Sequence, residues 1–366
     1  MRRKILHVTQ FLGVGGLEKI LFILIKEQMK AGHHVDLVVY DYEQSWVEYF
    51  RDNNINVISD YRKKRGYDTN LLKWLNSIIL NYDVIHTHDL NPIMYAVPLK
   101  LLAKLKGSTF PKLIHTAHGM DHIHKRPITL VYEKLCASIT DVTVGVSPAV
   151  MNVYRQRLFV HHERAININN GTLIENMPFS KGEYRKKINA QFGITNGNPI
   201  WVYVARVVPL KNHHFIIEAM KDSPQRNIIF VGPSGDDHYW EKIQNLLPPH
   251  IHMVGSCSNV NEILAASDFY ISASTHEGIP VAVLEAGAMK LPCLLSDIPG
   301  HRMMGEAAEY FSLENIHELK TKMAWLEKNS EIKNTLSYNL HQKVINHYSS
   351  KTMSDAYLAA YSGKAI

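Results

Sequence analysis

The sequence has few cysteines and no long apolar run. Its three cysteines among 366 residues, Cys136, Cys257 and Cys293, are isolated and lack metal-ligand spacing. A small, odd number of thiols is typical of a reducing compartment, so we expect a cytoplasmic protein. No apolar stretch reaches the roughly 18 to 20 residues that a membrane-spanning helix needs. Only two apolar residues separate the basic start from His7, which predicts a first strand instead of a signal peptide.

Two ligand-binding motifs are also missing. No His-Glu-x-x-His occurs, and the runs His86–His88 and His118–His124 lack clear further ligands, so we predict no metal site. The glycine loop Gly13–Gly16 opens a predicted helix after a strand, as dinucleotide-binding loops do. Glu18, however, stands where the third glycine of that fingerprint should be. A nicotinamide-dependent oxidoreductase, supported slightly by Asp41 after the second strand, therefore remains only an alternative.

The net charge of +6 is confined to the first half of the chain. Residues 1–180 hold 22 Lys and Arg against 16 Asp and Glu, whereas residues 181–366 hold 18 of each. Four of these cations form one cluster, Arg62, Lys63, Lys64 and Arg65. The cluster is either a solvated loop or a contact for an anionic membrane surface. No recognised motif accompanies the charge, so we expect no nucleic-acid binding.

Short runs rich in Val and Ile alternate with helix-length segments in both halves, which predicts two doubly wound domains with buried parallel sheets. We place the domains at 1–177 and 178–349, with a break near Met177 and a last helix within 350–366. The first helix should span Gly15–Lys30 and end at Gly32. Predicted strands are Lys4–Thr9, Val35–Tyr40, Val57–Ile58, Val84–His86, Lys112–Thr116, Val142–Val146, Trp201–Ala205, Ile228–Val231, His252–Val254, Phe269–Ser272 and Cys293–Ser296.

Two glutamates eight positions apart, Glu277 and Glu285, flank a turn and a helix start. Pro280 suits the first helical position, so the helix should begin there and continue through Glu285. The free amides of Gly278–Val281, which include Ile279, then lie at a helix N-terminus, where anionic or hydroxyl-rich ligands are favoured. Two carboxylates beside these amides predict a site for a polyhydroxylated, phosphate-bearing molecule.

Two cations follow the predicted strand Trp201–Ala205. Arg206 and Lys211 stand at the carboxyl edge of a sheet, where doubly wound folds bind ligands. Converging there, they could hold a diphosphate and offset charge that develops on it. The alternative is that both are ordinary surface cations at a strand end.

These patterns together resemble the retaining glycosyltransferases of family 4, whose signature pairs two glutamates separated by seven residues. The resemblance covers nearly the whole chain, and its motifs occur in the expected order. They are Phe11–Glu18, His115–Gly119, Ile168–Thr172, Val202–His213 and Ser274–Gly287. The resemblance implies a GT-B fold, in which two Rossmann-like domains face each other across a cleft and the last helix crosses back to the first domain.

The same resemblance implies a substrate class. The sugar donor would be a nucleotide-diphosphate sugar, with a UDP-sugar favoured and GDP-mannose possible, and no other cofactor is expected. The acceptor would be a glycan or lipid-linked glycan of bacterial surface polysaccharide, such as lipopolysaccharide. The enzyme would be cytoplasmic or peripheral on the inner membrane face. No Asp-x-Asp occurs, so we expect catalysis without a metal ion. A non-catalytic sugar-binding relative is the second alternative.

Residue roles follow from the resemblance as well. His118 should meet the transferred sugar near its 6-hydroxyl, Glu277 the transferred sugar or the acceptor, and Glu285 both ribose hydroxyls. The expected catalytic residues are His118, Glu277, Arg206 and Lys211. The other expected donor-binding residues are Gly15, Gly16, Gly255, Leu264, Gly278, Ile279, Pro280, Val281 and Glu285. The chain departs from the family pattern at Lys290, where glycine is common, and in the loop Asp297–Met303, which lacks a frequent Glu.

Overall fold

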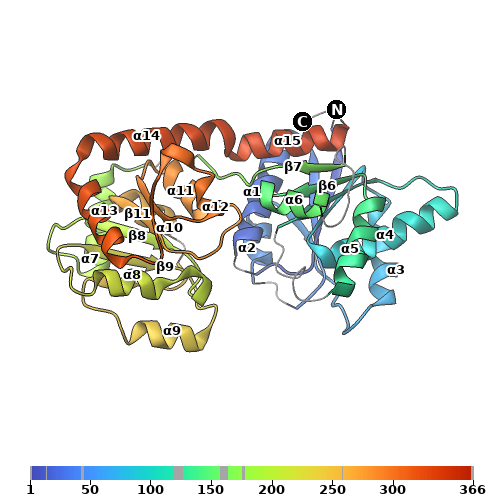
Figure 1. Ribbon diagram of the computed structural model, residues 1–366. Helices are drawn as coiled ribbons and strands as arrows, with labels where there is room; N and C mark the ends of the chain where they lie inside the picture. The colour runs from blue at the N-terminus through green and yellow to red at the C-terminus, as the bar shows by residue number, and fades with distance from the viewer. Residues whose placement is uncertain are drawn as a thin grey trace. The chain divides into compact units, whose positions relative to one another are not determined.

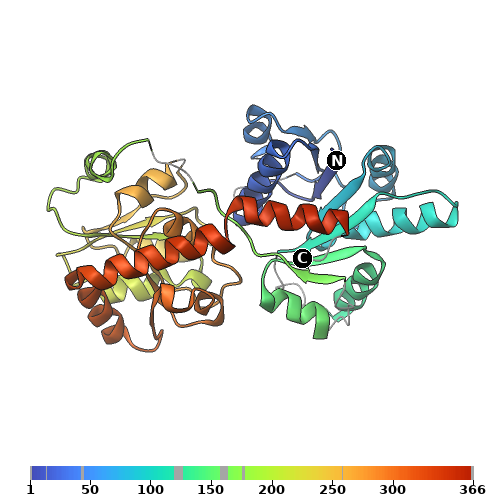
Figure 2. The same cartoon turned by 90° about the horizontal axis from the view of Figure 1, so that it is seen from above.

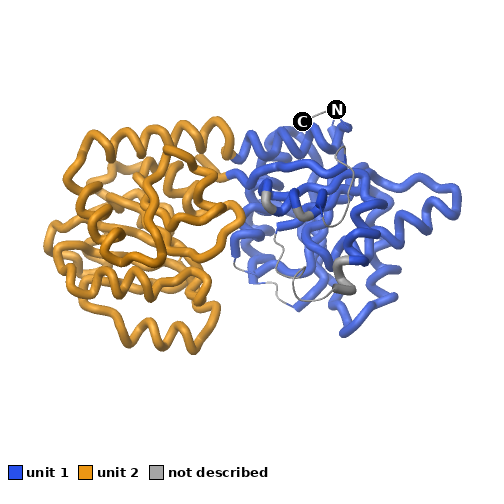
Figure 3. Tube along the Cα trace, viewed as in Figure 1, with its two compact units in different colours: residues 1–171, 350–366 blue, residues 172–349 orange. Residues whose placement is uncertain are grey.

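The protein forms two compact units. The computed structural model describes residues 2–13, 15–42, 45–118, 127–156, 164–174, 178–257 and 259–363. Unit 1 comprises Met1–Gly171 and Ser350–Ile366, and unit 2 comprises Thr172–Ser349 (Figure 3). The predicted domain break near Met177 falls on residues 175–177, outside the described residues. None of the helices in the described residues is both long and apolar enough to span a membrane.

Unit 1 is built on a seven-stranded parallel sheet in the order β3-β2-β1-β4-β5-β6-β7. Its last two strands, β6 and β7, are labelled in Figure 1. Its central strands are buried along nearly their whole length, because helices cover both faces. The strands are β1 (Lys4–Thr9), β2 (His34–Val39), β3 (Asn56–Ile58), β4 (Val84–His88), β5 (Lys112–Ala117), β6 (Val142–Gly145) and β7 (Ala165–Asn167).

Seven helices surround this sheet in the described residues: α1 (Gly16–Lys30), α2 (Val47–Asp52), α3 (Thr69–Ile79), α4 (Leu90–Leu105), α5 (Pro127–Ile139), α6 (Pro148–Gln156) and α15 (Ser350–Ser362). The C-terminal α15 packs beside α1 and so belongs to unit 1 (Figure 2). Its contacts include a hydrogen bond from Gln28 Nε2 on α1 to the Tyr361 hydroxyl, at 3.0 Å.

Unit 2 repeats the architecture with a six-stranded parallel sheet in the order β10-β9-β8-β11-β12-β13. Its strands are β8 (Ile200–Val204), β9 (Asn227–Val231), β10 (Ile251–Met253), β11 (Phe269–Ser272), β12 (Cys293–Ser296) and β13 (Glu309–Phe311). Its helices are α7 (Lys181–Phe192), α8 (His213–Met220), α9 (Asp237–Gln244), α10 (Val260–Ala266), α11 (Val281–Ala288), α12 (Pro299–Arg302), α13 (Ile316–Lys328) and α14 (Ser330–His347), with 3₁₀ turns η1 (Pro209–Lys211) and η2 (Gly305–Ala307).

The prediction of two parallel doubly wound sheets is confirmed. Of the eleven predicted strands, three have the predicted bounds and the other eight differ by one or two residues at an end. The sequence did not reveal β7 and β13. Each is three residues long, but so are β3 and β10, which the sequence did reveal, so length alone does not explain why these two strands were missed. Both form by pairing with a longer neighbour, β6 and β12 respectively.

Two local findings concern α11. Pro280 is its N-cap residue, with φ −76° and ψ 94°, so the helix begins at Val281, one residue later than predicted. The extended ψ of Pro280 turns the chain into the helix before the first helical residue. At the other end, Lys290 adopts a left-handed φ of 58°. Glycine suits that conformation best because it has no Cβ, so the glycine expected at this position from the resemblance would fit without strain.

Candidate functional site

The loop after β8 carries Arg206, which is exposed at the carboxyl edge of the unit 2 sheet. This loop lies against the loop after β9, and Val207 donates its backbone N–H to the carbonyl of Pro233 at 2.9 Å. A Cβ at Gly235 would come within 2.7 Å of the Arg206 side chain. Gly235 therefore lets the arginine stem lie flat on the neighbouring loop, which restricts where its guanidinium can reach.

Lys211 lies at the end of η1 and contacts Glu277, although the two are far apart in sequence. Lys211 Nζ is 2.5 Å from Glu277 Oε1, and the same oxygen accepts a hydrogen bond from Ser274 Oγ at 2.7 Å. The Tyr203 hydroxyl donates to the Lys211 carbonyl at 2.7 Å and lies 2.9 Å from Ser274 Oγ. The structure thus joins two predicted site residues and adds Ser274 and Tyr203, for which the sequence indicated no role.

The turn that carries Glu277 rests on the start of α12. A Cβ at Gly300 would lie only 2.4 Å from the Glu277 carbonyl oxygen, so any larger residue there would displace the turn. Next to it, the fully buried His301 places Nδ1 2.9 Å from the Ser296 carbonyl. Burial lowers the pKa of His301, although its hydrogen bond to Ser296 and the Glu277 carboxylate act in the opposite direction. A neutral imidazole therefore supports the turn.

The remaining predicted site residues of unit 2 differ in how far they are exposed to solvent. Glu285 lies within α11 with only 6% of its surface exposed, and Gly278 and Val281 are partly exposed at the start of that helix. Gly255 follows β10 with a positive φ of 72°, and its carbonyl accepts a hydrogen bond from Gly232 at 2.9 Å. Leu264 is fully buried in the core of the unit, so its side chain cannot touch a ligand directly.

Ile279 and Pro280 complete the turn and are largely buried. Their side chains pack into unit 2 while the turn that they form brings Glu277 beside Lys211. Their expected contribution to binding is therefore the path of the backbone and not a side-chain contact.

In unit 1, His118 follows β5 and is held from two sides. Its Nε2 is 2.9 Å from His88 Nδ1, and its backbone N–H donates to Asp89 Oδ1 at 3.0 Å. Asp89 itself has a left-handed φ of 62°, an unusual conformation that brings its carboxylate to this amide. Burial lowers the pKa of His118, so the ring is neutral near pH 7. Of the histidine run that follows His118, residues 119–126 lie outside the described residues.

The predicted glycine loop is only partly described, because residue 14 lies outside the described residues. Gly15 is the N-cap of α1, and a Cβ there would come within 2.6 Å of Glu18 Oε2. A Cβ at Gly16 would meet nothing within 4 Å. Glu18, which stands in place of the third glycine of the dinucleotide-binding motif, thus places its carboxylate over Gly15, just before α1.

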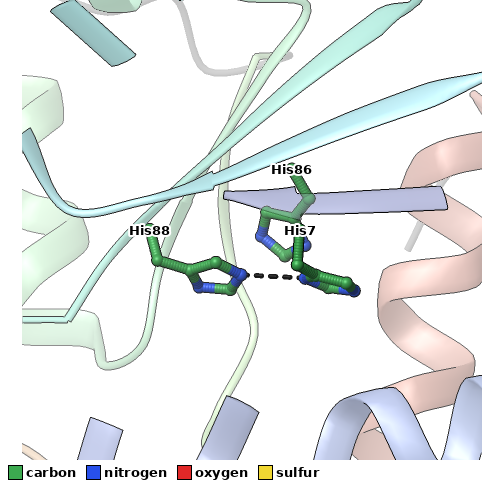
Figure 4. A group of neighbouring side chains, drawn as sticks. All are labelled: His7, His86 and His88. Carbon is green, nitrogen blue, oxygen red and sulfur yellow. Dashed lines mark hydrogen bonds between the residues drawn. The ribbon is translucent and has the colours of Figure 1, made fainter. Parts of the chain in front are cut away.

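Behind His118, three buried histidines gather in the core of unit 1, His7 on β1 and His86 and His88 on β4 (Figure 4). Their nearest ring nitrogens lie within 4.8 Å of one another, a spacing that could hold a metal ion. All six of their ring nitrogens, however, already have hydrogen-bond partners among protein side chains. A metal ion would have to displace these hydrogen bonds, so the arrangement fits a hydrogen-bonded chain better than a metal site.

The sequence contains only part of the signal for this histidine cluster. His86 and His88 alternate along one strand and therefore share a face of the sheet. His7 is the register partner of His86 on the neighbouring β1. Knowing that β1 and β4 are adjacent is necessary to bring the three together, and strand order is decided by the tertiary fold.

The basic cluster of unit 1 lies between β3 and α3. Arg62 donates to the backbone carbonyl of Ser59 at 2.6 Å, and Lys63 donates to that of Gly66 at 2.8 Å. Lys64 and Arg65 are exposed. Two of the four cations are thus partly occupied with their own loop.

Comparison with known proteins identifies the family. The family model described as Glycosyltransferase Family 4 matches residues 14–175, and that described as Glycosyl transferases group 1 matches residues 184–343. An Escherichia coli UDP-Gal:alpha-D-GlcNAc-diphosphoundecaprenol alpha-1,3-galactosyltransferase is 25% identical, over 73% of this chain and 72% of that protein. The capsular polysaccharide biosynthesis glycosyltransferase CapH of Staphylococcus aureus is also 25% identical, over 76% of each chain.

The fold has a solved counterpart as well. The crystal structure of Anabaena HepE in complex with UDP and glucose superposes with a TM-score of 0.85 at 18% identity, covering 99% of this chain and 100% of that chain. The two family models follow one another along the chain, one for each parallel sheet, and the whole-chain fold agrees with that of HepE. The protein therefore belongs to glycosyltransferase family 4 and is a glycosyltransferase with the GT-B fold.

Proposed function

We propose that this enzyme transfers a sugar from a nucleotide-diphosphate sugar, with retention of anomeric configuration, to a glycan or lipid-linked glycan during synthesis of bacterial surface polysaccharide, lipopolysaccharide included. A UDP-sugar is favoured over GDP-mannose. The name of the Escherichia coli relative, which pairs UDP-Gal with an acceptor on diphosphoundecaprenol, supports both the donor and the acceptor class. The name of CapH, a capsular polysaccharide biosynthesis glycosyltransferase, supports a role in surface polysaccharide synthesis.

The observation that carries this proposal is the contact between Lys211, Glu277 and Ser274 at the carboxyl edge of the unit 2 sheet. A lysine ammonium has three N–H donors. One is directed to Glu277, which leaves two for phosphate oxygens of a bound diphosphate. Arg206, exposed at the same sheet edge, would add a bidentate contact to the phosphates. Glu285 would accept hydrogen bonds from ribose hydroxyls, and the amides before α11 would face the sugar or its phosphate.

In the mechanism that we favour, the bond between the sugar's C1 and the diphosphate oxygen breaks as the acceptor hydroxyl bonds to C1 on the same face. The acceptor's proton passes to the leaving diphosphate. Lys211 and Arg206 would offset the negative charge that develops on that group. Glu277 already accepts hydrogen bonds from Lys211 and Ser274, which suits a positioning role better than nucleophilic attack at C1. His118 would contact the transferred sugar.

Metal independence is part of the proposal. Two cations at the sheet edge can supply the charge compensation that a divalent ion supplies in other phosphate-transferring sites. The clamp of Arg206 and Lys211 would therefore be sufficient without magnesium or manganese.

Contact with an anionic membrane is a separate element of the proposal. Lys64 and Arg65 are exposed in the basic loop, and each cation near an anionic surface contributes about 1 kcal/mol of attraction. Sedimentation with phosphatidylglycerol vesicles should bring the wild-type protein down more than a Lys64→Ala/Arg65→Ala variant does. Equal sedimentation of both proteins would remove this loop from the proposal.

The transferase proposal is tested by incubating the purified protein with UDP-sugars or GDP-mannose and a glycan on undecaprenyl diphosphate. Mass spectrometry should show the acceptor gaining one sugar, and NMR of the product should show the anomeric configuration of the donor. Release of nucleotide diphosphate without sugar transfer would point to the wrong acceptor. Saturable donor binding without any turnover would favour a non-catalytic relative, and an inverted anomer would refute retention.

A further inference from the structure

A continuous chain of side-chain hydrogen bonds runs through the core of unit 1 and ends at His118. His118 Nε2 is 2.9 Å from His88 Nδ1. His88 Nε2 is 2.9 Å from His7 Nδ1, the contact drawn as a dashed line in Figure 4. His7 Nε2 is in turn 2.8 Å from Gln28 Oε1. His7, His88 and Gln28 are fully or almost fully buried, so water does not compete for these contacts. We call these four residues the relay.

The three imidazoles of the relay are neutral near pH 7. Burial lowers the pKa of His7 to about 4, despite its hydrogen bond to Gln28 Oε1, which acts in the opposite direction. Burial also lowers the pKa of His88 well below its usual value, and neighbouring histidines add to the effect. The pKa of His118 is lowered by burial as well. Each ring therefore carries one N–H and one bare nitrogen, which makes the position of each proton depend on its neighbour.

Gln28 sets the direction of the chain. Its amide oxygen faces His7, and its NH₂ group donates to the Tyr361 hydroxyl at 3.0 Å. With the Gln28 amide in this orientation its oxygen accepts from His7, so His7 carries its proton on Nε2 and its Nδ1 is bare. His88 must then donate from Nε2 to His7 and accept at Nδ1. His118 consequently donates from Nε2, and its own Nδ1 is left as a hydrogen-bond acceptor.

The second branch of the network starts at the same glutamine. The Tyr361 hydroxyl is 2.7 Å from His86 Nδ1, and His86 Nε2 is 2.7 Å from Thr116 Oγ1. Thr116 Oγ1 is 3.2 Å from the Tyr357 hydroxyl, where the branch ends. Hydroxyl groups both donate and accept, so this branch can adapt to either direction and does not determine the tautomer of His118.

We propose that Gln28, His7 and His88 are positioning residues that hold His118 in the tautomer protonated at Nε2, so that Nδ1 accepts a hydrogen bond from a hydroxyl of the bound sugar donor. This inference rests on the proposed function for the sugar contact, whereas the tautomer itself is a property of the ligand-free protein. The relay explains why a buried core position in each of α1, β1 and β4 is polar.

The tautomer can be measured directly. Long-range ¹H–¹⁵N correlation spectra of protein labelled at histidine distinguish a protonated from a bare ring nitrogen, and a His118→Gln variant assigns the signal. The ligand-free wild type should show His118 protonated at Nε2 and bare at Nδ1. A proton on Nδ1 of His118 would overturn the inference.

Three variants test the cause. In Gln28→Leu the chain loses its fixed end, so His118 should become a mixture of tautomers and turnover at saturating donor should fall roughly tenfold, about the effect of one lost hydrogen bond. Gln28→Glu retains an acceptor beside His7 and should keep the wild-type tautomer. Tyr357→Phe, which removes one hydroxyl from the far end of the other branch, is the matched control and should retain both the tautomer and turnover.

The outcomes separate the relay from the transferase proposal. A folded Gln28→Leu protein with an unchanged His118 tautomer would overturn the relay, whatever its turnover, since Gln28 would then be merely structural. If Gln28→Leu does not fold, the Gln28→Glu spectrum decides in its place. A wild-type protein that has the Nε2 tautomer but transfers no sugar would overturn only the proposed function.

Discussion

The two units share one architecture but place their polar residues differently. In unit 1 the polar groups lie inside the core, where His7, His86 and His88 are at most 2% exposed and form hydrogen bonds to one another and to their neighbours. In unit 2 it lies at the carboxyl edge of the sheet, where the side chains of Lys211 and Glu277 keep 21% and 15% of their surface exposed. Neutral groups tolerate burial when they are hydrogen-bonded, whereas charged groups need access to water or to a charged ligand.

The two units therefore offer different kinds of polar group to a ligand. The edge of the unit 2 sheet offers charge that a phosphate-bearing ligand can use. The buried histidines of unit 1 carry no charge near pH 7, but they can fix the orientation and proton position of a single residue, His118. The following predictions test this comparison.

The largest effect should come from the cations of unit 2. Arg206→Ala and Lys211→Ala should each lower turnover about a hundredfold or more, since losing one donor to developing charge costs roughly 3–4 kcal/mol. Steady-state kinetics at saturating donor measure this, with circular dichroism as a check on folding. Near-normal turnover in either variant would remove that residue from the mechanism.

Gly300→Ala should move the Glu277 turn, because the new Cβ would lie 2.4 Å from the Glu277 carbonyl oxygen. A displacement of about 1 Å at a reacting centre can cost up to about a hundredfold in rate. Gly182→Ala is the control, since its Cβ would meet only Ser180 Oγ, at 3.9 Å. Equal turnover of the two variants would show that the turn is not supported by this contact.

The two glutamates should separate in a binding experiment. Glu285→Ala should weaken nucleotide-diphosphate binding about ten- to a hundredfold, the value of one or two hydrogen bonds to a carboxylate. Glu277→Ala should bind the nucleotide almost normally and turn over poorly. Calorimetric titration of both variants decides this. The assignments are reversed if Glu277→Ala alone loses affinity.

Acid should destabilise unit 1 more than unit 2. The pKa values of His7, His86, His88 and His118 are lowered on folding, so the unfolded chain binds more protons below about pH 6.5. Stability is therefore full above that pH and is lost as the pH falls toward the folded-state pKa, about 4 for His7. At pH 5 His7, whose folded-state pKa is about 4, should by itself cost about 2 kcal/mol of stability.

Hydrogen exchange at pH 7 and pH 5, corrected for intrinsic rates, would measure the loss of stability in peptides from each unit separately. Unit 2 also holds buried neutral histidines, and the pKa of His213 is lowered to about 3 by burial and by Lys211. It should thus lose stability too, but less. Equal loss in both units would contradict the assignment of four such groups to unit 1.

The smallest effect should be that of a chelator, which we expect to leave turnover unchanged. Assays in excess EDTA, with and without added magnesium or manganese, measure it. A loss of activity that metal restores would contradict metal independence. A His7→Gln variant that then no longer responds to metal would identify the histidine cluster as the binding place.

Much of the fold could be predicted because it depends on local pattern. Apolar runs such as Lys4–Thr9 and Phe269–Ser272 coincide with β1 and β11, since a strand buried on both faces must be apolar throughout. The site was predicted only in part. Arg206, Lys211 and the two glutamates were recognisable from their spacing, but the ion pair of Lys211 with Glu277 was not, because it joins loops after two different strands.

By itself, then, the sequence determined the two parallel sheets, their edge cations and the glutamate signature, since each is encoded within a short stretch of chain. The tertiary structure alone decided that α15 packs on unit 1, that Gly300 supports the Glu277 turn, and that His7 and His88 meet behind His118. The physical reason is the same in each case. These contacts depend on which strands are neighbours and how closely two backbones approach, and packing of the whole chain fixes both.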